Sequence, residues 1–115
     1  MSTSIGAVTA ETFSDNVIES PVPVLVKFWA EWCPPCNALD PVIERIAATT
    51  GPGLRFVSLN ADEHPELSAR YGALGLPVLK VFAGGQVVKT ILGAKPEAAL
   101  RHELAAFLDY GARDR

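Results

Sequence analysis

Two cysteines carry the most evident chemistry in this sequence. Cys33 and Cys36 are the only cysteines of the chain, and they stand three residues apart in Trp32-Cys33-Pro34-Pro35-Cys36. An apolar run precedes them and a helical pattern begins at about Pro34, so both are expected at the start of a helix. At that spacing the sulfurs can form a disulfide and lose it again without a large backbone movement. The spacing therefore predicts a redox-active pair.

The two thiols are expected to play different parts. Cys33 lies at the helix N-terminus, where unpaired N–H groups and the helix dipole favour a thiolate, the attacking species in thiol–disulfide exchange. Cys33 is therefore the predicted nucleophile, and Cys36, one turn further in, is the predicted resolving thiol. Because Pro34 and Pro35 have no N–H, the N–H of Cys36 is the local donor that remains for the Cys33 sulfur.

Three other roles for the cysteines compete with redox chemistry. A structural disulfide closing a loop of about four residues would remove only about 2 kcal/mol of chain entropy, which adds little to a domain with its own core. A zinc site would need two further ligands, and His64 and His102 are single residues on separate expected helices. Inert packing cysteines fit poorly with the flanking tryptophan and double proline. We therefore expect no bound metal and surface positions for both histidines.

Strand and helix patterns alternate along the chain in a way that can position the pair. Val24–Trp29 is apolar on both faces apart from Lys27, which is typical of a central strand covered on both sides. A helix with one apolar stripe and a second strand follow, which makes a βαβ unit with parallel strands. Gly84-Gly85 predicts a hairpin, so the last strand should return antiparallel. The pattern indicates an α/β protein with a mixed central sheet and helices on both faces.

The expected helices are a short one beginning at Thr9, one over Pro34–Thr50, a short one within Asn60–Tyr71, and a last one over Pro96–Tyr110 with Gly111 after it. The expected strands are Val24–Trp29, Leu54–Leu59, Val78–Phe82 and Gln86–Leu92.

Composition limits the classes of function. The chain has 115 residues, which predicts a single domain over 1–115, and 49% of them are hydrophobic, enough for a core. A net charge of −3 without a basic block argues against a nucleic-acid or membrane-surface role. The densest apolar run, Val22–Ala30, is much shorter than the roughly twenty residues of a membrane helix, and Met1–Ala10 shows no secretory pattern. We expect a cytoplasmic monomer.

Several segments together resemble the thioredoxin family, from about Thr9 to Tyr110. They are Phe28-Trp29-Ala30-Glu31-Trp32-Cys33-Pro34-Pro35-Cys36, Pro41, Asn60-Ala61-Asp62, Gly75-Leu76-Pro77 and Leu92-Gly93-Ala94. The resemblance implies the thioredoxin fold, with a core over about 9–110 and a cis bond between Leu76 and Pro77. It also implies a Cys33–Cys36 redox disulfide that reduces protein disulfides, with no bound cofactor. Electrons would come from NADPH through a flavin-containing thioredoxin reductase, so this reductase and disulfide-containing proteins are the expected partners.

The resemblance further implies a target-binding rim around the disulfide. Small residues and a backbone edge there would let an extended peptide lie across the cysteines by strand addition. Simple packing or turn geometry is the competing interpretation for each position, and from the residues alone it is favoured for Gly93 and Ala94. The rim consists of Trp32, Pro34, Pro35, Ala61, Gly75, Leu76, Pro77, Gly93 and Ala94.

The sequence departs from the family pattern in three places. Pro34-Pro35 replaces the usual Gly-Pro, Lys27 stands where the family carries a buried aspartate, and Ser58 replaces that aspartate's lysine partner. Lys27 either extends to solvent with no chemical role or points inward beneath the cysteines and tunes their acidity. At about 6 Å its ammonium would favour a thiolate by about 3 kcal/mol with an effective dielectric of 20. These departures motivate an alternative function as an oxidant, an isomerase or a thioredoxin-fold binding or chaperone module.

Overall fold

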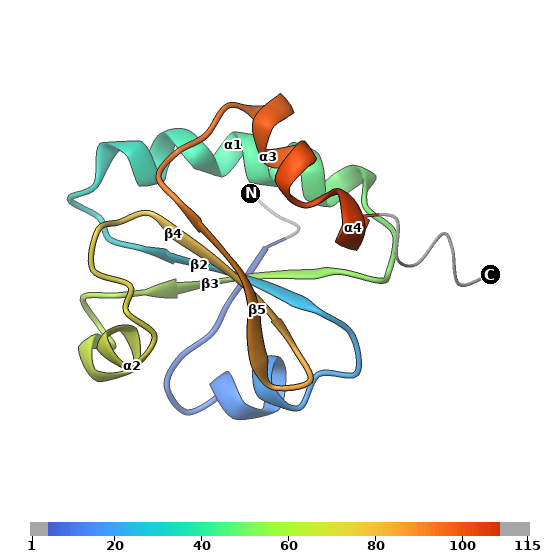
Figure 1. The fold of residues 1–115 in the computed structure, drawn as a ribbon. Coiled ribbons are helices and arrows are strands. Elements are labelled where there is room, and N and C mark those ends of the chain that lie inside the picture. The colour runs from blue at the N-terminus through green and yellow to red at the C-terminus, as the bar shows by residue number, and fades with distance from the viewer. Residues whose placement is uncertain (1–4, 109–115) are drawn as a thin grey trace.

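A computed structural model describes residues 5–108, in which a five-stranded sheet lies between two layers of helices (Figure 1). The strand order across the sheet is β1-β3-β2-β4-β5. The strands are β1 (Gly6–Ala7), β2 (Val24–Trp29), β3 (Arg55–Asn60), β4 (Val78–Ala83) and β5 (Gln86–Leu92). The helices are a π-helical turn η1 (Ser14–Ile18), α1 (Pro34–Thr49), α2 (Pro65–Arg70), α3 (Glu97–Glu103) and α4 (Ala105–Leu108).

The central strand β2 has one parallel and one antiparallel neighbour. It pairs in parallel with β3 through the crossover helix α1, and antiparallel with β4, which in turn pairs antiparallel with β5. The predicted mixed sheet and its βαβ unit are therefore confirmed. Phe28 is opposite Val78, and Val78 is opposite Leu92. The end of β2, the start of β4 and the end of β5 therefore lie at the same end of the sheet. The end of β3 joins them there, since Trp29 is opposite Asn60.

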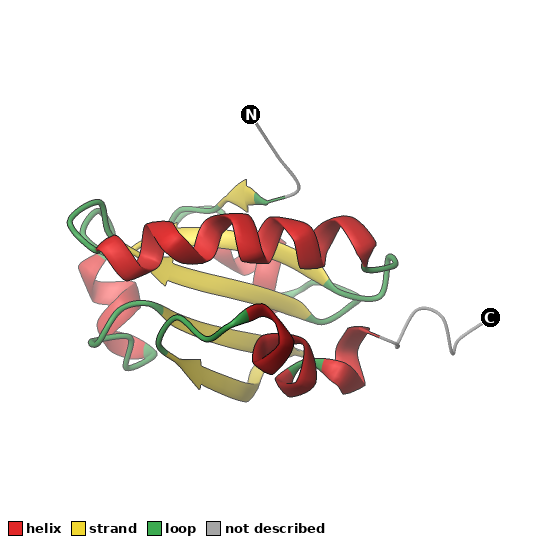
Figure 2. Cartoon of the chain, turned by 90° about the horizontal axis from the view of Figure 1, so that it is seen from above, coloured by secondary structure: helices red, strands yellow, loops and turns green. Residues whose placement is uncertain are grey.

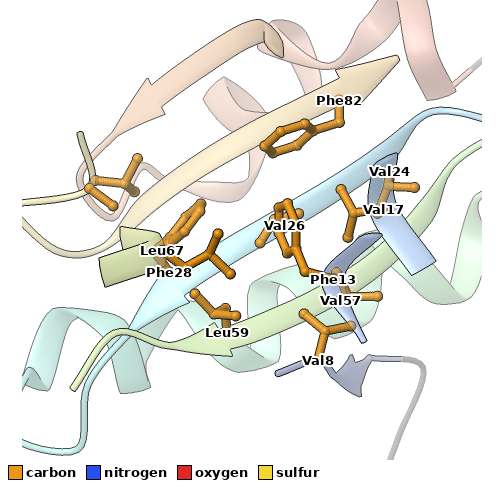
Figure 3. Close-up of a cluster of buried hydrophobic side chains, with 12 residues drawn as sticks. Val8, Phe13, Val17, Val24, Val26, Phe28, Val57, Leu59, Leu67 and Phe82 are labelled. Carbon is orange, nitrogen blue, oxygen red and sulfur yellow. The ribbon is translucent and has the colours of Figure 1, made fainter. Parts of the chain in front are cut away.

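Side chains of β2 alternate between two cores. Val24, Val26 and Phe28 point into the cluster below the sheet, together with residues of η1 and α2 (Figure 3). Leu25 points the other way, into a cluster with apolar side chains of α1 and α3. Figures 1 and 2 show α1, α3 and α4 on that same face of the sheet. Burial on both faces explains the nearly continuous apolar sequence of this strand.

Several bounds differ from the sequence prediction by one residue, and three differences are larger. The expected last helix is interrupted at Leu104, which divides it into α3 and α4, and the expected end at Tyr110 with Gly111 lies outside the described residues. The first helix begins later than expected. The Thr9 hydroxyl accepts the Thr12 N–H at 3.3 Å, but this closes a turn, and the helical residues that follow have π geometry. Finally, β1 was not predicted from the sequence.

No helix within residues 5–108 is long and apolar enough to cross a bilayer.

An ion-pair network joins α1 to α3. Arg45 donates to Glu97 at 2.8 Å, and Arg101 donates to the other oxygen of the same carboxylate at 3.1 Å. The hydrogen bond from Arg45, followed by that from Arg101, lowers the pKa of Glu97 below its ordinary value of 4.5. A depressed folded-state pKa means that the stabilisation is present above the unfolded value and is lost as the pH falls through the folded value.

Glu97→Gln should therefore lower the free energy of unfolding slightly at neutral pH and have no effect in acid. The effect is small because the side chains of the network are all partly exposed to solvent. Urea unfolding of both proteins near pH 7 and about pH 3 measures the difference. Glu19→Gln, which removes a carboxylate without an ion pair among residues 5–108, is the control and should change neither value. An equal loss for Glu97→Gln at both pH values would contradict the electrostatic explanation.

Candidate active site

The cysteine pair lies at the junction between β2 and α1. Cys33 is the N-cap of α1, and Cys36 lies within its first turn. The two are joined by a disulfide, with their Cα atoms 5.3 Å apart, as the spacing predicts. Prolines fit the first helical positions because N–H groups there have no partner within the helix. The Cys36 N–H, the donor expected to remain, is directed to the Cys33 sulfur at 3.2 Å.

Both cysteines are nearly inaccessible in this disulfide form. Cys33 is 2% exposed and Cys36 is fully buried, so accessibility alone hardly distinguishes them. The position of Cys33 at the helix start is the stronger reason to regard it as the nucleophile. Ala30 forms a cluster with the two cysteines, and Trp29 and Leu76 pack against that cluster.

Loops from four strands meet beside the disulfide. The bond between Leu76 and Pro77 is cis, as the resemblance implies. The carbonyl of Pro77 accepts the N–H of Gly93 at 3.0 Å, and the Ala61 N–H donates to the Trp29 carbonyl at 2.8 Å. These bonds hold the segments after β3, before β4 and after β5 together at the same end of the sheet. The structure therefore brings the expected rim segments together around one end of α1.

Exposure differs among the expected rim residues. Gly93 has a φ of 84°, which side-chain-bearing residues rarely adopt, so turn geometry alone explains a glycine at this position. Leu76 is the rim residue that packs directly against the cysteines. Trp32, Pro34, Pro35, Gly75 and Ala94 are exposed, Leu76 and Gly93 are half-buried, and Ala61 and Pro77 are buried.

Three residues that the sequence prediction did not assign belong to this surface. The indole N–H of Trp32 donates to the Asp62 carboxylate at 2.6 Å, which fixes the ring although it is 64% exposed. Leu74 and Leu92 are also largely exposed, and they flank the segment that contains the cis bond. Asp62 directly follows Ala61, so its place in a matching motif was the available signal. Leu92 directly precedes Gly93 in another matching segment, which was the same kind of signal. Leu74 gave none, because single exposed apolar residues are common.

Lys27 is buried and does not extend to solvent. It is 3% exposed and shares with Leu25 and Trp29 the face of β2 that is turned toward α1. Its ammonium lies 5.7 Å from the Trp29 ring centroid and donates to the carboxylate of Asp40 on α1. The side chain thus ends against α1, the helix that carries the cysteines, so the interpretation in which Lys27 extends to solvent is wrong.

A hollow of about 160 Å³ opens beside the ion pair. It lies between α1 and the strands, and it contains both partners of the pair and a second carboxylate one helical turn further along. The lining residues are Ile5, Lys27, Trp29, Asp40, Glu44 and Ser58. Ser58, which replaces the family's lysine, is directly opposite Lys27 on β3. Among residues 5–108, no three His, Cys, Asp or Glu side chains are grouped so that they could share a metal ion.

Comparison with known proteins gives a consistent family assignment. The Thioredoxin family model matches residues 4–106. The chain is similar to a thioredoxin of Streptomyces clavuligerus, 50% identical over 93 residues that cover 81% of this chain and 86% of the relative. Thioredoxin 1 of Synechococcus elongatus is 43% identical over 98 residues, covering 85% and 92% of the two chains. A chloroplastic M-type thioredoxin of Chlamydomonas reinhardtii is 43% identical over 104 residues, or 90% and 74%.

These relatives and the joined cysteine pair favour disulfide exchange over the alternative of a binding or chaperone module. The mixed sheet with helices on both faces is the fold that the resemblance implies. The chain belongs to the thioredoxin family, and it is a protein-disulfide oxidoreductase whose redox centre is the Cys33–Cys36 pair.

Proposed function

We propose that this protein reduces disulfides of cytoplasmic proteins and is itself reduced by NADPH through a flavin-containing thioredoxin reductase. In this proposal it acts as a monomer, with one domain over 1–115 and no bound cofactor. The observation that supports it best is the placement of Cys33, at the start of α1 and beside the cis Leu76–Pro77 bond. A thiolate there could attack a target disulfide, form a mixed disulfide, and be released by the thiol of Cys36.

The rim around the disulfide is the proposed site for targets. An extended segment of a target can lie along the backbone at Gly75 and Leu76 by strand addition, with its disulfide over Cys33. The exposed indole of Trp32, held by Asp62, supplies an apolar surface next to the sulfur. Ala61, Gly93 and Ala94 leave room because their side chains are small or absent. The remaining rim residues are Pro34, Pro35 and Pro77.

A reconstituted assay tests the electron route. NADPH, a bacterial thioredoxin reductase and a disulfide-containing protein substrate are mixed, and NADPH oxidation is recorded with and without this protein. Oxidation that depends on this protein and continues in proportion to the substrate supports the proposal. Equilibration with glutathione buffers gives the potential of the cysteine pair. A potential well above about −200 mV would contradict a reducing role and favour an oxidant or isomerase.

Lys27 is the proposed tuning residue of the cysteine pair. Its ammonium favours a nearby thiolate, and Asp40 cancels part of that effect because the two charges are paired. Lys27→Met should raise the pKa of the Cys33 thiol, by less than the loss of an unpaired charge at the same position would. The redox potential should fall, because the reduced form loses support.

Alkylation rate against pH measures the thiol pKa, and glutathione equilibration measures the potential. Lys80→Met is the matched control: Lys80 is half-buried on β4, on the opposite face of the sheet from Lys27. It should change neither quantity. Lys27→Asp should move both quantities further than Lys27→Met, since it replaces a positive charge with a negative one. If both Lys27 variants match the parent protein, Lys27 does not tune the site.

A further inference from the structure

Release of a target requires that a buried thiol lose its proton. When the Cys36 sulfur attacks the mixed disulfide at Cys33, it must do so as a thiolate. Cys36 is 0% exposed in the disulfide form, so bulk water does not reach this sulfur directly. The proton therefore needs an acceptor that lies close to Cys36 and is itself in contact with solvent.

Asp40 has the position that such an acceptor needs. It stands four residues after Cys36 on α1, and side chains at this spacing are neighbours on one face of a helix. Its side chain is 49% exposed and borders the hollow described above, so water reaches the carboxylate. One oxygen, Oδ1, accepts from the Lys27 ammonium, whereas Oδ2 has no hydrogen-bond partner among residues 5–108. That oxygen is free to accept a proton, directly or through one water molecule.

The other polar groups around this hollow are less suitable. Lys27, from β2, donates to Asp40 in the ion pair, and an ammonium has no lone pair to offer. Glu44, from α1, is two helical turns from Cys36 and outside the i, i+4 distance. Ser58, from β3, has a hydroxyl that is a weak base at neutral pH. Ile5, which precedes β1 and also lines the hollow, is apolar and cannot accept a proton. Asp40 is the group that combines basicity, proximity in the helix and contact with solvent.

We propose that Asp40 accepts the proton of Cys36 during the resolving step and passes it to water. As the Cys36 sulfur bonds to the Cys33 sulfur, the bond between Cys33 and the target sulfur breaks. The target leaves as a thiolate with the electron pair of that bond, so the target is reduced and the cysteine pair is oxidised. The Cys36 proton moves to Asp40 and then to solvent, while Lys27 holds the carboxylate in place. The assignment rests on the proposed role of Cys36 as the resolving thiol.

A chromogenic aromatic disulfide separates the two chemical steps. The reduced protein should release one coloured thiolate when Cys33 attacks, and a second when Cys36 resolves the mixed disulfide. In Asp40→Asn the second release should slow at least about tenfold near neutral pH, as loss of a general base predicts. The first release should not slow, because Lys27 without its partner supports the Cys33 thiolate at least as well as in the parent. The defect should shrink as the pH rises, because hydroxide then removes the proton. A role through charge alone predicts the reverse, since loss of a negative charge favours the thiolate and should speed the second release.

Matched variants make the result decisive. Glu44→Gln removes a carboxylate from the same hollow and should resolve at the parent rate, and Asp40→Glu should restore most of the rate. If Asp40→Asn does not fold, Lys27→Met/Asp40→Asn avoids an unpaired buried ammonium, and its second release should be slower than that of Lys27→Met by a similar factor. A second release at the rate of its reference, the parent or Lys27→Met, in whichever of these Asp40→Asn proteins folds overturns the proposal. Failure of the parent to release two coloured thiolates would instead overturn the assigned roles of the cysteines, and the Asp40 proposal with them.

Discussion

Cys33→Ser should reduce protein disulfides no faster than the buffer thiols alone, whereas Cys36→Ser should still attack targets and then remain attached to them. The serine hydroxyl at position 33 is not ionised at neutral pH and cannot start the exchange. With serine at position 36, the mixed disulfide at Cys33 forms but has no internal thiol to resolve it. The assay is substrate reduction, followed by non-reducing electrophoresis of each variant after incubation with a disulfide-containing protein.

The two variants serve as controls for each other, since each removes one thiol from the same helical turn. Iodoacetamide should also modify Cys33 of the reduced parent before Cys36, because the helix start favours its thiolate. Trapping by Cys33→Ser as efficient as that by Cys36→Ser would show that the roles are reversed.

Phe28→Ala should destabilise the protein by about 3–5 kcal/mol, at the upper end of the range for single core replacements. Phe28 is fully buried on the central strand, within the cluster that joins the sheet to the helical layer with η1 and α2 (Figure 3). Loss of the ring removes its transfer free energy and leaves a cavity that strands on both sides of β2 keep from closing. Urea unfolding of the oxidised protein measures the difference.

Val88→Ala is the control for this experiment. Val88 is also an apolar strand residue, but it is 51% exposed on β5, so its truncation should change the free energy of unfolding by less than about 0.5 kcal/mol. Similar losses in the two variants would mean that the loss does not come from the buried core.

The chemistry of the site was largely predictable because it depends on local sequence. The spacing of the cysteines and the absence of N–H groups at Pro34 and Pro35 determine the first turn of α1 and its one hydrogen bond to sulfur. The strands followed from apolar patterning, since burial of both faces of β2 leaves a clear trace in the sequence. The break at Leu104 leaves no such trace, because both sides of it keep the apolar spacing that a continuous helix would show. A two-residue strand such as β1 is too short for any periodicity.

The partner of Lys27 could not be predicted from patterning, because it depends on how α1 is placed over the sheet. Lys27 was identifiable as an unusual residue in an apolar strand, and its two interpretations differed only in where the side chain ends. Asp40 was visible as a polar residue one turn after Cys36, but periodicity does not reveal which strand residue lies below it. Pairing across elements distant in the sequence needs the tertiary structure.

The ion pair between β2 and α1 also restricts the order in which its residues could have been acquired. Asp40 is half-exposed, so a carboxylate there can keep part of its hydration without any partner. Lys27 is buried, and an ammonium there without Asp40 would cost about 3–5 kcal/mol, a large part of the stability of a small domain. An ancestral chain could therefore accept Asp40 first and Lys27 afterwards, whereas the opposite order passes through a protein close to unfolding. Once both are present, Asp40 becomes the harder of the two to lose.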